Sequence, residues 1–107
     1  MFDPKTILRN KRQAKALTGI SSFEFEKLLR EFMLILPSKI PRGIETKLKT
    51  ARDKLFFILF YLKCYPTIDL AAAIYKVDRS QISRWVVQLK LLLQKTLNKE
   101  LEQDTLY

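Results

Sequence analysis

The chain has 107 residues, of which 48% are hydrophobic, and its two glycines and four prolines supply few turns for a multi-stranded sheet. Twenty Lys and Arg residues against eleven Asp and Glu residues give a formal net charge of +9, which points to a polyanionic partner. Because the chain has no histidine and one cysteine, Cys64, we exclude a Cys/His zinc site, a histidine-based triad and an intrachain disulfide, and we expect neither enzymatic activity nor a cofactor or metal.

We expect a single all-α domain, a small helical bundle. A first helix is predicted to open at Pro4 and to run to about Leu17, since proline is accepted in the first turn of a helix. Ser21 marks a second start, because it is a preferred N-cap residue and Glu24, three positions later, completes a capping box. This second helix should run to about Leu36.

A basic, irregular stretch follows and leads into an almost wholly apolar helix. Thr50 and Asp53 have the spacing of a second helix start, and the residues from Leu55 to Leu62 are all hydrophobic. A helix that is apolar on every side is buried. This segment should therefore be the centre of the bundle, and Pro66 should end it by disfavouring the helical conformation at the preceding residue.

Two further helices are predicted close together. Thr67 is placed to cap a helix over Ile68–Tyr75, and Asp78 with Gln81 opens another helix that could extend to Leu101. Two helices joined by three residues after a buried helix indicate a helix-turn-helix. The chain is thus expected to contain N-terminal helices (1–36), a basic loop (37–49), a central helix (50–65), a helix-turn-helix (67–93) and a C-terminal extension (94–107).

The last helix has an apolar face and a polar face. At about 100° per residue, the apolar face centres between Ile82 and Leu89 and includes Trp85, so Ser80 and Arg84 should point away from the core. Arginine can donate two hydrogen bonds to guanine, glutamine can recognise adenine, and serine suits phosphate or a base edge. The alternative is an ordinary helix hairpin with a polar outer face. The base-edge candidates are Arg79, Ser80, Gln81, Ser83 and Arg84.

Other polar and basic side chains could contact a nucleic-acid backbone. Such contacts give affinity without sequence information and weaken steeply with salt. For each residue taken singly, a solvated surface charge is an alternative interpretation. The phosphate candidates are Thr67, Lys76, Lys39, Arg42, Lys47, Lys49, Arg52 and Lys54.

Five stretches in the same order carry a resemblance to a known family. They are Leu17-Thr18-Gly19-Ile20-Ser21, Phe23-Glu24-Phe25-Glu26, Asp53-Lys54-Leu55, Phe60-Tyr61-Leu62-Lys63 and Val77-Asp78-Arg79-Ser80-Gln81-Ile82-Ser83-Arg84-Trp85. With them, the region from about Leu17 to Leu97 resembles the N-terminal helix-turn-helix domain of bacterial insertion-sequence transposases of the DDE superfamily. The resemblance implies recognition of the terminal DNA of a mobile element, followed in a full-length enzyme by a metal-dependent strand-transfer domain.

The sequence departs from that family in two ways. The family usually has glycine at the turn where Lys76 stands, so we expect Lys76 either to adopt a left-handed conformation or to reshape the turn. The chain also ends at Tyr107, before any catalytic domain, so the catalytic role does not carry over. It is either a truncated form or a short first reading frame whose catalytic part is encoded separately.

Two apolar residues of the last helix suggest a protein partner in addition to double-stranded DNA. Val87 and Leu91 fall on the polar side, where a second copy of the chain or a catalytic domain would cover them. The longest apolar run is far shorter than the roughly 20 residues of a membrane span, and there is no signal-peptide pattern, so we expect a cytoplasmic protein with no membrane contact. The remaining alternatives are a transcriptional regulator with an equivalent domain and a helical protein-interaction module.

Overall fold

The computed structural model describes residues 2–36 and 47–105, with side chains to residue 99, and its helices form the all-α fold that the sequence predicts. No strand occurs in these residues. The helices are α1 (Pro4–Arg9), α2 (Lys11–Thr18), α3 (Ser22–Ile35), α5 (Ala51–Cys64), α6 (Ile68–Tyr75) and α7 (Arg79–Thr105).

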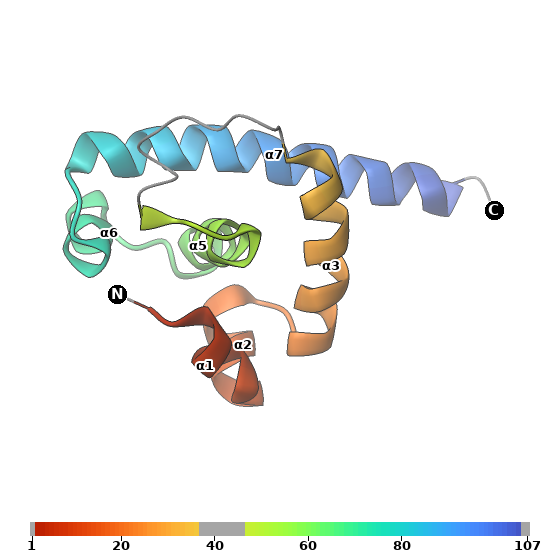
Figure 1. Cartoon of the computed structure of the whole chain (residues 1–107), viewed down its shortest axis with the longest axis horizontal. Helices are drawn as coiled ribbons and strands as arrows, with labels where there is room; N and C mark the ends of the chain where they lie inside the picture. The colour runs from red at the N-terminus through yellow and green to blue at the C-terminus, as the bar shows by residue number, and fades with distance from the viewer. Residues whose placement is uncertain (1, 37–46, 106–107) are drawn as a thin grey trace.

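Helix α5 occupies the centre of the domain (Figure 1). It packs against α1 and α2 on one side and against α7 on the opposite side. Helix α3 also packs against it and lies to its right in this view. The long helix α7 also packs against α3 and α6, so it crosses the whole domain. The predicted basic loop lies largely outside the described residues, which resume at residue 47.

The prediction of one helix from Pro4 to Leu17 is wrong, because the chain forms two helices that meet at Asn10. Asn10 is extended, with φ −96° and ψ 110°, and its side chain accepts a hydrogen bond from the Gln13 backbone N–H at 3.1 Å. Asparagine is a strong N-cap residue, and here its local hydrogen bond competes with continuation of the helix. Gly19, in the left-handed conformation at φ 83°, then ends α2.

The predicted helix starts at Ser21 and Thr50 are confirmed. Each side chain accepts a hydrogen bond from the backbone N–H three residues on, and in return the carboxylates of Glu24 and Asp53 accept from the capping residues' own N–H groups. These reciprocal bonds satisfy donors that the first turn of a helix leaves unpaired. Helix α5 ends at Tyr65, which is left-handed (φ 49°) immediately before Pro66.

The core is aromatic and joins α5 to the last two helices. Phe57 is fully buried and makes edge-to-face contacts with Tyr75 of α6 and Trp85 of α7, at ring-centroid distances of 5.1 and 5.3 Å. Burial raises the pKa of the Tyr75 phenol above its ordinary value. Trp85 is only 1% exposed, which confirms its predicted place in the core.

Among the described residues, none of the helices combines the length and hydropathy that a membrane crossing requires.

Candidate nucleic-acid interface

Helices α6 and α7 form the helix-turn-helix. The Thr67 hydroxyl accepts a hydrogen bond from the Leu70 N–H at 3.0 Å and caps α6, as predicted. At the other end of the turn, the Asp78 carbonyl accepts from the N–H groups of Gln81 (3.0 Å) and Ile82 (3.3 Å) and begins α7. The bond from the Val77 N–H to the Ala72 carbonyl closes the turn between them.

The structure decides between the two predicted alternatives for the turn, a left-handed Lys76 or a reshaped turn. Lys76 adopts the left-handed conformation, with φ 55° and ψ 50°, and its N–H donates to the Ala72 carbonyl at the end of α6. The turn therefore keeps a left-handed position at this point, with a lysine in it. For a residue with a Cβ atom this backbone conformation costs about 1–2 kcal/mol.

Replacing Lys76 by glycine should consequently raise the free energy of unfolding by about 1 kcal/mol, because glycine adopts this conformation without a steric penalty. Lys76→Ala is the matched control, since it removes the same charge and keeps the strained conformation. Urea unfolding of the two variants and the wild type measures the difference. A glycine variant no more stable than the alanine variant would contradict this account of the turn.

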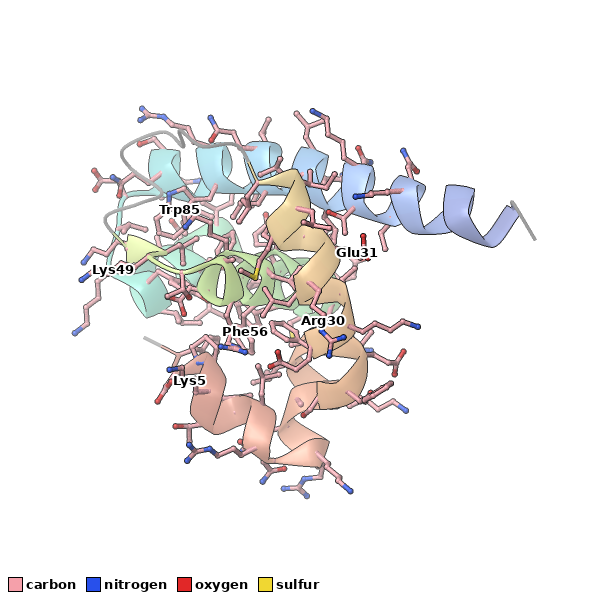
Figure 2. The ribbon with its side chains drawn as sticks, turned by 45° about the vertical axis from the view of Figure 1, so that its right-hand side comes forward. Lys5, Arg30, Glu31, Lys49, Phe56 and Trp85 are labelled. Carbon is pink, nitrogen blue, oxygen red and sulfur yellow. The ribbon has the colours of Figure 1, made fainter. Side chains whose placement is uncertain are left out.

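The N-terminal half of α7 has a buried apolar face and an exposed polar face, as the spacing of its apolar residues predicts. Ile82 and Leu89 are fully buried in the core together with Trp85, which lies between α7 and α5 (Figure 2). Ser80 and Arg84 are exposed on the opposite face. The same packing that fixes α7 to the domain therefore leaves a polar face free along its first turns.

The other three base-edge candidates differ in exposure. Ser83 is exposed beside Arg84. Gln81 is half-buried and lines a shallow cavity at the turn, so its amide has less freedom than the sequence suggested. Arg79 is 70% exposed and forms an ion pair with Asp69 of α6, in which Nε lies 3.0 Å from Oδ1. Because the partner is on another helix, the spacing of residues along α7 does not predict this contact.

The phosphate candidates separate into three groups. Thr67, Lys76, Lys47 and Lys49 are exposed. Lys49 projects outward at the end of the molecule where α6 lies (Figure 2). Lys39 and Arg42 lie outside the described residues. Of the last two, Arg52 is half-buried and Lys54 is buried.

Lys54 and Arg52 are less accessible than the other described phosphate candidates. Lys54 is only 2% exposed, and its Nζ lies 3.4 Å from the Lys49 carbonyl oxygen. It precedes Phe57 and Ile58 by three and four positions on the buried face of α5, a signal available in the sequence. Arg52 binds both carboxylate oxygens of Glu26 on α3, at 2.8 and 2.9 Å, and so links two helices.

The exposed apolar residues of α7 lie farther along the helix. Val87 is 61% exposed and Leu91 is 54% exposed, in agreement with their predicted position on the outer side.

Among the described residues there is no group of three or more acidic, histidine or cysteine side chains that could hold a metal ion. The exposed candidates Arg79, Ser80, Ser83 and Arg84 form a polar and basic surface.

A buried central helix, a capped short helix, a tight turn and a following helix with an exposed polar face define a helix-turn-helix protein. Residues 46–99, about half of the chain, match the family described as the helix-turn-helix of DDE superfamily endonuclease, and the chain belongs to this family. Membership implies DNA binding. The match covers the helix-turn-helix alone and no catalytic domain. No curated protein and no solved structure matched the chain.

Proposed function

We propose that this chain binds double-stranded DNA sequence-specifically by inserting the N-terminal half of α7 into the major groove. The target sequences would be the terminal sequences of a transposable element, and the chain would act as the DNA-recognition part of a transposase. The observation that carries the proposal is the exposed face of Ser80, Ser83 and Arg84, which is held in place by the buried Trp85 side of the same helix.

Each base-edge candidate has a chemical role in this proposal. Arg79 and Arg84 can each donate two hydrogen bonds to the O6 and N7 atoms of a guanine. The hydroxyls of Ser80 and Ser83 suit a phosphate or a base edge. Gln81 can pair with an adenine only if its half-buried amide turns outward from the cavity between α6 and α7.

Contacts to the DNA backbone would set the register of α7 in the groove. Lys76 stands in the turn before α7, and Thr67 is at the start of α6, the other helix of the helix-turn-helix. Lys47 and Lys49 precede α5 and are exposed. Because Arg52 and Lys54 are engaged within the protein, they are not part of this backbone-binding set.

Selection of the purified chain against a random duplex library near physiological salt tests the proposal. A recovered motif that also occurs at the ends of a mobile element would support the transposase role, and a motif beside a regulated gene would favour a transcriptional regulator. Binding without a motif would count against sequence recognition, because any protein of this net charge binds DNA nonspecifically at low salt.

The exposed Val87 and Leu91 favour a second role in protein interaction, with another copy of the chain or a catalytic transposase domain as partner. For the homodimer, Leu91→Lys should shift the chain toward the monomer in sedimentation experiments at high concentration. Leu34→Lys, which adds the same charge at an exposed leucine of α3 and leaves the apolar pair intact, serves as the control. A wild-type chain that is monomeric throughout, together with unchanged solubility and DNA binding of Leu91→Lys, would contradict a role for this pair.

A further inference from the structure

An ion pair between Asp69 and Arg79 joins α6 to α7. Asp69 is the second residue of α6 and Arg79 is the first residue of α7, so the pair bridges the two helices of the helix-turn-helix. Both side chains are largely exposed, at 75% and 70%. An exposed pair contributes little to stability. Asp69 also lies in the first turn of α6, where a carboxylate is favourable, but this position alone does not require a partner on α7.

A carboxylate at this place is unfavourable for DNA binding in general. The domain carries a net charge of +9 and the proposed interface is polar and basic, whereas Asp69 would approach a surface of phosphates. Its negative charge lowers the affinity for every duplex, whatever the sequence. The same charge can serve discrimination between sequences if it controls a side chain that contacts a base.

The geometry of the ion pair shows how Asp69 can act on sequence recognition through Arg79. In the ion pair, Oδ1 of Asp69 lies 3.0 Å from Nε of Arg79, so the two terminal nitrogens, Nη1 and Nη2, are at the other end of the guanidinium. Those two nitrogens form the end of the guanidinium that matches the O6 and N7 atoms of guanine. Fixing the side chain before binding also reduces the conformational entropy lost in the complex.

We propose that Asp69 is a positioning residue, which holds the Arg79 guanidinium for guanine recognition and lowers the affinity for noncognate DNA. This inference rests on the proposed function, since it assumes that α7 enters the major groove. Without Asp69, the arginine is free to turn to a phosphate, where it contributes affinity and no sequence information.

The experiment compares the wild type with Asp69→Asn, Arg79→Ala and Glu24→Gln. Each protein is titrated with the duplex selected by the wild type and with duplexes that carry every single-base change. Glu24→Gln is the matched control, because it removes one negative charge from α3, as Asp69→Asn does from α6. Glutamine is also accepted at this position of a capping box, so the helix start should be kept.

Arg79→Ala should abolish a guanine preference at one position. Asp69→Asn should reduce the preference at that same position by about 2- to 5-fold, the range that an exposed ion pair can supply, and should tighten binding to noncognate duplexes. Glu24→Gln should leave the preference unchanged. Circular dichroism of each variant checks that the helices are retained.

Two results would overturn the inference while leaving the proposed function intact. One is an Asp69→Asn variant that keeps the full guanine preference, and the other is a loss of preference at a position that Arg79→Ala does not affect. A wild-type chain that selects no motif would instead overturn the proposed function itself. The selection therefore distinguishes the two failures before any variant is measured.

Discussion

Replacing Phe57 by alanine should lower the free energy of unfolding by about 3–5 kcal/mol, the usual cost of removing a large buried aromatic side chain. Phe57 is 0% exposed and its ring lies against those of Tyr75 and Trp85, so the substitution leaves a cavity where α5, α6 and α7 meet. A domain of this size is commonly stable by only about 5–15 kcal/mol. Urea unfolding followed by circular dichroism measures the change.

Phe23→Ala provides the control, because it deletes the same group from a side chain that is 77% exposed. The free energy of unfolding of this variant should stay within about 0.5 kcal/mol of the wild type. Comparable losses in both variants would mean that the aromatic cluster is not the centre of the core. A Phe57→Ala protein that unfolds with nearly wild-type stability would contradict the packing described here.

Arg84→Ala should remove the preference at one base position, at a cost of about 1–3 kcal/mol for the preferred duplex. Arg84 is exposed on the face of α7 opposite the core, where a guanidinium can reach a guanine edge, and its loss should matter little to duplexes that lack that base. Fluorescence anisotropy titrations with the selected duplex and its single-base variants give the two affinities.

Lys49→Ala is expected to behave differently. It should weaken the binding of all duplexes by a similar factor and reduce the slope of log K against log salt by about 1, because it removes one phosphate contact. If Arg84→Ala and Lys49→Ala produced equal losses independent of sequence, Arg84 would have no base-reading role. The proposed assignment of base and backbone contacts would then fail.

The helix starts were predictable from the sequence because capping is local. Ser21, Thr50 and Thr67 each bond a backbone N–H only three residues away, so the signal lies within four consecutive residues. The break at Asn10 was missed although asparagine is an N-cap residue. The surrounding lysines, arginines and alanines favour a helix, and the sequence alone did not decide between a continuous helix and a new start.

The sequence predicts which side of α7 is buried and which is exposed, but it does not predict the ion pairs that candidate residues form with other helices. The buried and exposed sides of α7 follow from helical periodicity, which placed Trp85 and Arg84 correctly. The partners of Arg52 and Arg79 come from other helices, so no spacing within one helix identifies Glu26 or Asp69. The resemblance of the region before residue 46 to the transposase family stays a prediction, since the family match begins there.

The most direct test of the central claim is to map the DNA contact surface with backbone amide chemical shifts of the isotope-labelled chain and the selected duplex. At physiological salt, the largest changes should fall between Thr67 and Arg84, from the start of α6 through the first turns of α7. Helices α1 and α2, on the other side of α5, should show little change (Figure 1). Changes concentrated in α1 and α2, with α7 unaffected, would contradict recognition through the helix-turn-helix.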